Sequence, residues 1–218
     1  MDRSPFAVAS ISVFAIRKKQ YLRSCYNTGL GLYKYDTITF SPSDGGIGNV
    51  IPFSLQASSF DDDGLLEDYA YVIRGKWLVD NSFPSQTLIF QFNTSCADLL
   101  GQIDPMYRLA RPCSFVSTRG IVEKVNFNEP EDSVNNDATC LIVMSHQEID
   151  QMSSEIVKFH AEYSIGESKM YFERNSITVG ETLLDIEGEL SGLCNTNGRI
   201  VVNDCLQQTF DRPRLTND

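Results

Sequence analysis

A strand with a glycine at its centre occurs twice in this chain, and the two copies are separated by about half of the chain. The first copy contains Gly75 and folds back through a polar turn into residues 87–92. The second contains Gly188 and folds back in the same way into residues 199–202. Charged residues flank the glycine in both copies. The repeat of a whole hairpin predicts two similar β-domains in tandem.

The rest of the chain also carries the signals of short strands. Runs of β-branched and aromatic residues alternate with Gly, Asn, Asp, Ser and Pro, which predicts about five strands in each half. We expect these strands at residues 6–16, 30–40, 50–56, 69–79, 87–93, 114–127, 138–145, 155–164, 180–192 and 198–208. Helical periodicity is weak, and the best candidates for a turn or two of helix are residues 95–103 and 147–155. The predicted fold class is therefore all-β.

Two stretches of the second half resemble the oligonucleotide/oligosaccharide-binding (OB) fold. Residues 115–125 look like its long first strand, bent at Gly120, and residues 178–190 look like the strand that leads into its closing hairpin. A strand shared by both faces of a small barrel must coil sharply, and a glycine permits this. The first half matches through its hairpin at residues 69–93. The resemblance implies two tandem small Greek-key barrels of OB type.

We expect the chain to divide into four parts. The first β-barrel domain covers residues 1–95, and the OB-like second barrel covers residues 113–210. Residues 96–112 form a connector between them, because two Xaa-Pro steps favour extended chain there. Residues 211–218 form a polar tail.

The formal net charge of −11 restricts the choice of partner. Nucleic-acid binding draws much of its affinity from Lys and Arg side chains that neutralise phosphates, and this chain is not basic overall. The charge is uneven, however, because within residues 1–35 only Asp2 opposes Arg3, Arg17, Lys18, Lys19, Arg23 and Lys34. The sequence therefore allows a local basic face. The acidic remainder fits a module that docks a basic protein.

The sequence contains no recognisable catalytic or metal-binding pattern. His146 and His160 lack metal-site spacing, and no G-x-S-x-G motif supports a nucleophilic serine. The six cysteines include no C-x-x-C pair, which argues against a zinc module and favours a reduced intracellular chain. The apolar stretch at residues 6–16 is too short to span a bilayer. We expect a non-enzyme without cofactor or metal, in the nucleus or cytoplasm and not in a membrane.

Single-stranded nucleic acid is held by aromatic rings that stack on bases and by cations that follow the backbone. Basic and aromatic residues of this kind give a candidate site that consists of Arg74, Lys76, Trp77, Arg119, Lys124, Lys158 and Phe159. Aromatic residues also fill barrel cores, and strand alternation places Trp77 on the face opposite Lys76. Two functions therefore stay open beside a third possibility, a carbohydrate- or capsid-type β-sandwich, which would predict disulfides. One is the binding of single-stranded DNA or RNA, and the other is an acidic protein–protein interaction module or subunit of a larger complex.

Overall fold

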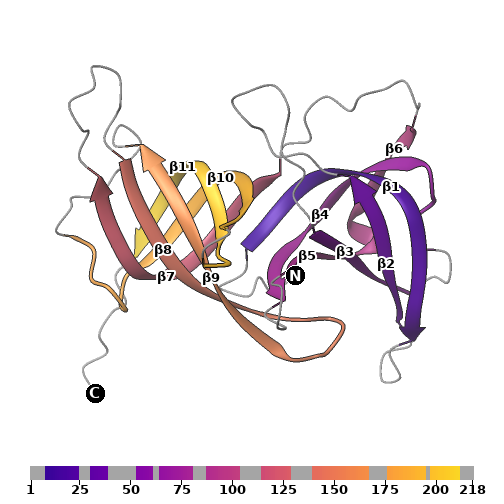
Figure 1. The fold of residues 1–218 in the computed structure, drawn as a ribbon, viewed down its shortest axis with the longest axis horizontal. Helices are drawn as coiled ribbons and strands as arrows, with labels where there is room; N and C mark the ends of the chain where they lie inside the picture. The colour runs from indigo at the N-terminus through magenta and orange to yellow at the C-terminus, as the bar shows by residue number, and fades with distance from the viewer. Residues whose placement is uncertain are drawn as a thin grey trace. The chain divides into compact units, whose positions relative to one another are not determined.

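The computed structural model describes residues 8–24, 30–38, 53–60, 64–80, 87–103, 114–128, 139–166, 176–194 and 197–211 (Figure 1). Most of these residues lie in strands, and the helical element that joins two of them is the short 3-10 turn η1 (Thr94–Cys96). The all-β class predicted from the sequence is confirmed. Within the described ranges, no helix is long and apolar enough to cross a membrane.

The chain forms two compact units. Unit 1 comprises Met1–Val8, Val116–Glu148 and Lys158–Asp218. Unit 2 comprises Ala9–Phe115 together with the short segment Ile149–Val157. The domain boundaries expected from the sequence stay a prediction, and residues 104–112 of the expected connector lie outside the described residues.

Unit 2 is built on a closed ring of strands. Its strands are β1 (Val8–Ser24), β2 (Gly31–Ile38), β3 (Phe53–Ser59), β4 (Tyr69–Asp80), β5 (Thr87–Asn93) and β6 (Ala97–Gln102). Neighbours follow the order β1-β2-β3-β5-β4, and β4 pairs again with β1, which closes the ring. β3 and β5 run parallel, whereas β1–β2, β2–β3 and β4–β5 are antiparallel. β6 extends the sheet beyond β4.

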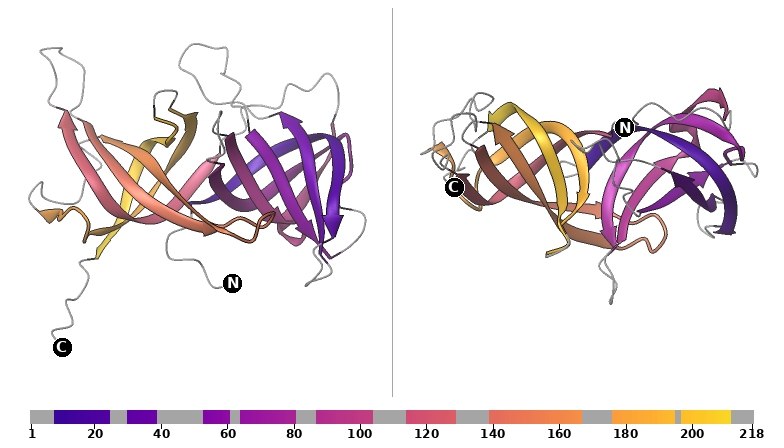
Figure 2. Two further views of the ribbon diagram at one scale, coloured as in Figure 1. Left: turned by 60° about the horizontal axis from the view of Figure 1, so that its bottom comes forward. Right: turned by 45° about the horizontal axis from the view of Figure 1, so that its top comes forward.

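Unit 1 repeats this pairing pattern with its own strands. They are β7 (Phe115–Asn128), β8 (Thr139–Ile149), β9 (Ile156–Gly166), β10 (Leu183–Leu193) and β11 (Ile200–Asp211). Their order is β7-β8-β9-β11-β10, with β10 paired back to β7 and with β9 and β11 parallel. Both rings therefore have the strand order 1-2-3-5-4-1 that gives the five-stranded OB barrel its Greek-key closure. Figure 2 shows the strong coiling of these strands from two further directions.

The two glycines of the sequence repeat occupy the fourth strand of each ring, β4 and β10. A Cβ atom on Gly75 would lie 2.5 Å from the carbonyl oxygen of Gln91 and 2.6 Å from the ring of Phe90. A Cβ atom on Gly188 would lie 2.7 Å from the carbonyl oxygen of Asn203. In each ring, then, the glycine lets the neighbouring fifth strand approach the backbone closely. The hairpin repeat read from the sequence has this shared physical cause.

Each closed ring of strands encloses its own core. In unit 2 the ring of Trp77 is fully buried and packs edge-on against Phe53 and Phe90, with centroid distances of 5.5 and 4.7 Å. In unit 1 the buried imidazole of His146 lies 3.0 Å, through Nε2, from the hydroxyl of Tyr163, and the ring of Phe159 stacks on it at 5.6 Å. Burial of each large apolar side chain contributes roughly 1.5–3 kcal/mol.

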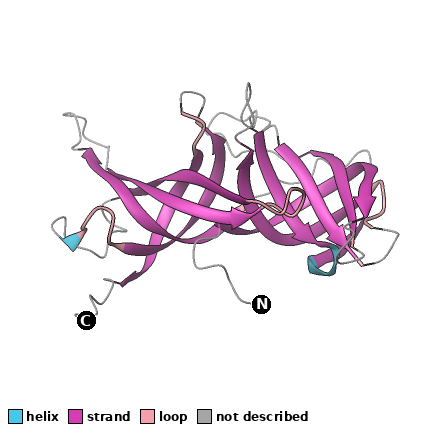
Figure 3. Ribbon diagram, turned by 90° about the horizontal axis from the view of Figure 1, so that it is seen from below, coloured by secondary structure: helices cyan, strands magenta, loops and turns pink. Residues whose placement is uncertain are grey.

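Residues 95–103 and 147–155 do not form the expected helices, although the start of the first range lies in the 3-10 turn η1. All ten expected strands are present, residues 87–93 with the expected ends and the other nine with shifted ends. Residues 97–102 form β6 because they pair with the first half of β4, which satisfies their backbone hydrogen bonds. Residues 147–149 continue β8, and a tight turn follows them. β1 also continues to Ser24, well beyond its expected end. Figure 3 shows how far strands dominate the described residues.

Candidate nucleic-acid interface

The outer face of unit 2 carries a row of polar side chains that crosses all strands of its ring. Residues paired across neighbouring strands lie on the same face of a sheet. Gln20 pairs with Lys34, and Lys34 pairs with Gln56. Gln56 pairs in turn with Gln91, and Gln91 pairs with Lys76. We call Gln20, Lys34, Gln56, Gln91 and Lys76 the polar row.

Strand alternation explains why these side chains point outward. Lys34 on β2 and Gln91 on β5 are each flanked by buried aromatic residues, namely Tyr33, Tyr35, Phe90 and Phe92. Successive side chains of a strand point to opposite faces, so burial of the aromatic rings in the core directs Lys34 and Gln91 to the outer face. Lys34 is exposed there, whereas Lys76 is half-buried.

The hairpin of β1 and β2 adds a cluster of cations beside the polar row. Beyond Ile16, nearly all of β1 is exposed. The cations of the two strands, which we call the basic hairpin, are Arg17, Lys18, Lys19, Arg23 and Lys34. In the described part of these strands the acidic side chain is Asp36, which pairs with Lys18. A cluster with this excess of positive charge attracts the phosphate backbone of a nucleic acid.

Unit 2 also carries two exposed aromatic side chains, one on β1 and one directly after β3. Tyr21 on β1 is 54% exposed, and its ring meets Tyr33 edge-on at 5.4 Å. Its hydroxyl lies 2.6 Å from the hydroxyl of Ser24, which fixes the side chain. Phe60 directly follows β3 and is 76% exposed. Both rings are accessible surfaces on which an unpaired base can stack.

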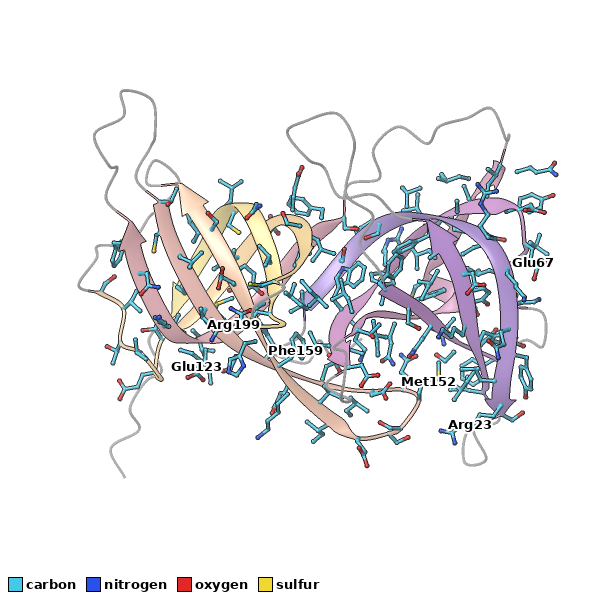
Figure 4. All side chains as sticks on the ribbon, in the orientation of Figure 1. Arg23, Glu67, Glu123, Met152, Phe159 and Arg199 are labelled. Atoms are coloured by element: carbon cyan, nitrogen blue, oxygen red, sulfur yellow. The ribbon has the colours of Figure 1, made fainter. Side chains whose placement is uncertain are left out.

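Residues 149–157, between β8 and β9, cover the middle of the polar row. Gln91 is 0% exposed, and its amide nitrogen donates to Oε1 of Gln56 at 2.9 Å and to the carboxylate of Asp150. The amide oxygen of Gln91 accepts a hydrogen bond from the backbone N–H of Gln151 at 3.1 Å. Arg23 of the basic hairpin donates to the carbonyl oxygen of Met152, and Figure 4 labels both residues. We call residues 149–157 the acidic tip, after Asp150 and Glu155.

Asp150 holds the acidic tip together. Its carboxylate accepts hydrogen bonds from the backbone N–H groups of Met152 at 3.0 Å and Ser153 at 3.2 Å. Its own backbone N–H donates to the carbonyl of Glu155 at 2.9 Å and closes the turn. Burial acts to raise the pKa of Asp150, but the hydrogen bonds from Met152, Gln91 and Ser153 outweigh it and hold the pKa below its usual value. The carboxylate is therefore ionised at neutral pH and places a negative charge on the polar row.

The sequence-predicted site residues of unit 2 lie in three different surroundings. Lys76 belongs to the polar row. Arg74 is exposed and forms an ion pair with Asp98 at 2.9 Å. Trp77 is fully buried in the core, so the stacking role predicted for it does not fit this position. The alternation that directs Lys76 outward directs Trp77 inward.

The predicted site residues of unit 1 are less favourably placed. Lys124 and Lys158 are exposed, and Nε of Arg119 lies 3.5 Å from the carboxylate of Asp185. Phe159 is buried against His146, so a stacking role does not fit this residue either. The outer face of β10 is acidic, because Asp185, Glu187 and Glu189 alternate with buried residues along the strand.

Sequence reasoning missed most of the polar row and Tyr21. The signal for the row was an outward polar residue between two aromatic residues, as in Tyr33-Lys34-Tyr35 and Phe90-Gln91-Phe92. Within the described part of the chain, no three His, Cys, Asp or Glu side chains gather as metal ligands would.

The strand order of the two rings defines an all-β protein of OB type. Among solved structures, the chain is similar over nearly its whole length to the single-stranded DNA binding protein from Thermus aquaticus. The wild-type structure matches with a TM-score of 0.52 and 9% identity, over 95% of this chain and 93% of that chain. A deletion mutant of the same protein matches with a TM-score of 0.52 and 10% identity, over 96% and 98%. At this identity the similarity establishes the fold. No protein-family model and no curated protein matches the sequence.

Proposed function

We propose that this chain is a non-enzymatic protein that binds single-stranded nucleic acid through the outer face of unit 2, with single-stranded DNA as the preferred ligand. The polar row carries the proposal. Its lysines suit phosphates, and the amides of Gln56 and Gln91 suit the edges of bases, which present both donors and acceptors. Phe60, directly after β3, supplies an exposed ring for stacking, whereas Tyr21 lies on the opposite face of β1, because it follows Gln20 and pairs with the inward-facing Tyr33. The similarity in fold to the single-stranded DNA binding protein from Thermus aquaticus supports this choice.

The acidic net charge is compatible with this proposal. Charges on a protein surface are screened over a Debye length of about 8 Å at physiological salt, so a bound phosphate responds mainly to the charges near it. The basic hairpin supplies local positive charge, since Asp36 is the acidic side chain in the described part of its strands.

Fluorescence anisotropy of a labelled single-stranded oligonucleotide at several salt concentrations tests the proposal. We expect binding that weakens as the salt concentration rises. Each Lys or Arg side chain that neutralises a phosphate releases a counterion from the nucleic acid, and added salt opposes this release. The double variant Lys34→Gln, Lys76→Gln should bind about tenfold more weakly for each lost phosphate contact. It should also lower the slope of log affinity against log salt by roughly 0.7 per contact.

The matched control is the double variant Lys124→Gln, Lys158→Gln, which removes the same charge from exposed positions of unit 1. We expect it to change affinity less than the first pair does. Equal losses would extend the interface to the residues predicted for unit 1, Arg119 included. Absence of binding at low salt for the wild-type protein would refute the proposal.

A second function is favoured by one observation, the acidic row on β10. Carboxylates that alternate along one strand face offer a surface complementary to a basic protein, which mainly speeds and selects association. We propose this interaction module as the alternative. Copurification of one stoichiometric basic partner that is lost on charge reversal at Glu187 and Glu189 would support it.

A further inference from the structure

The acidic tip occupies the same groups of unit 2 that the proposed function assigns to nucleic acid. Its carboxylate and one backbone N–H bind the amide of Gln91, and its Met152 carbonyl binds Arg23. As a result, Gln91 is fully buried although it lies on the outer face. A bound strand would present similar chemistry there, namely anionic oxygens for Arg23 and hydrogen-bonding edges for the amide.

We propose that the acidic tip is an internal competitor that covers the polar row until a nucleic-acid strand displaces it. This inference rests on the proposed function and adds a form of regulation to the same surface. The ionised carboxylate of Asp150 repels phosphate, so the covered state lowers affinity through charge as well as through occupancy. A ligand that binds only the uncovered state has its apparent affinity reduced by the fraction of molecules in that state.

The tip is built as a self-contained turn, which suits displacement as a unit. Asp150 is hydrogen-bonded to Met152, Ser153 and Glu155 within the tip, so these bonds persist when the tip leaves Gln91. Ser154 takes a positive φ of 63° that completes the reversal. In contrast, the bonds from the tip to Gln91 and Arg23 would be exchanged for bonds to the ligand.

The variant Asp150→Asn tests the role of the charge. The asparagine oxygen can still accept the hydrogen bond from Met152, whereas the bond that the other carboxylate oxygen accepts from Ser153 is lost, and the negative charge beside the polar row is removed. We expect single-stranded DNA to bind roughly five- to tenfold more tightly. The matched control is Glu155→Gln, which removes one charge from the same tip without touching a contact with Gln91. An equal gain in both variants would overturn the proposal, because net charge alone would then explain it.

A second variant tests occupancy directly. The backbone bond between Asp150 and Glu155 is the closing pair of a hairpin, so Gln151–Ser154 can be replaced by a two-residue Asn-Gly turn. This change removes Gln151, whose N–H binds Gln91, and Met152, whose carbonyl binds Arg23, while Asp150 is kept, and we expect tighter binding than in the wild-type protein. Weaker binding would show that the tip is part of the binding surface and would overturn the proposal.

Hydrogen exchange of the wild-type protein gives an independent readout. The N–H of Gln151 is bonded to Gln91, so its exchange should accelerate when an oligonucleotide binds, whereas the N–H of Met152 should stay protected by Asp150. Added protection at Gln151 would overturn the proposal while leaving the proposed function intact. If no variant binds an oligonucleotide at low salt, the proposed function fails and the inference fails with it.

Discussion

The two units share one strand order but carry different chemistry on their outer faces. In unit 2 the outer face of β1 and β2 is basic, and a row of amides and lysines continues it across the ring. In unit 1 the corresponding fourth strand, β10, carries Asp185, Glu187 and Glu189 instead. The residues that close the ring are alike, since Gly75 and Gly188 allow the same close approach. The strand order and the central glycine are thus repeated, while the residues of the outer face are not. This is expected when packing determines the inward residues and function determines the outward ones.

The largest expected effect concerns Trp77, which tests whether the aromatic residues of unit 2 belong to its core or to its surface. The change Trp77→Ala should lower the free energy of unfolding by about 3–5 kcal/mol, because it leaves a cavity between Phe53 and Phe90. Urea denaturation measures this loss. The affinity of the remaining folded protein for an oligonucleotide should change little.

Trp77→Phe is the matched control. Among the described residues, Nε1 of Trp77 is buried without a hydrogen-bond partner, so phenylalanine loses ring area but also removes an unsatisfied donor. We expect a much smaller loss of stability than for alanine. Intact stability combined with lost binding in Trp77→Ala would instead return Trp77 to the interface and break the distinction between core and surface.

The next effect tests whether the fourth and fifth strands approach each other equally closely in the two units. Gly75→Ala and Gly188→Ala should each destabilise the protein by about 1–3 kcal/mol, since each new methyl group meets the backbone of the neighbouring strand. Chemical denaturation of both variants gives the comparison. Gly166→Ala is the control, because a Cβ atom there meets no atom within 4 Å in the described part of the chain, and we expect a change close to zero. A neutral result at either Gly75 or Gly188 would show that the repeat is one of sequence only.

The sequence was sufficient for features that depend on local patterns. Alternation and turn residues located the strands, and the central glycines located the fourth strand of each ring. The same alternation left Trp77 undecided between core and stacking surface, because it states that Trp77 and Lys76 face opposite ways but not which face is inside. The face is decided by the neighbours on paired strands.

The acidic tip was beyond the reach of sequence reasoning for a different reason. Asp150 and Gln91 are 59 residues apart, and no local pattern specifies which segment covers an outer face. The weak helical signal at residues 147–155 was also wrong, because three of these residues complete β8 and the others form the turn. Long-range contacts of polar residues leave no periodic trace, whereas apolar faces do.

The smallest expected effect compares the buried tyrosines of the two cores. Burial raises the pKa of Tyr35 in unit 2 from 10.0 to about 12, and the hydrogen bond that its hydroxyl accepts from the N–H of Leu65, 2.9 Å long, only partly offsets this. Burial also raises the pKa of Tyr163 in unit 1. The folded state therefore holds these protons more tightly than the unfolded chain does.

It follows that the stability linked to Tyr35 is fully present below pH 10 and is lost as pH rises from 10 towards 12. Circular dichroism and tyrosinate absorbance, recorded together against pH, should show ionisation of the buried tyrosines only as the fold is lost. Tyr35→Phe should make the unfolding of unit 2 less dependent on pH in this range, while Tyr163 keeps that dependence in unit 1. Reversible ionisation of Tyr35 near pH 10 in the folded protein would contradict its burial, and the two cores would then differ as their outer faces do.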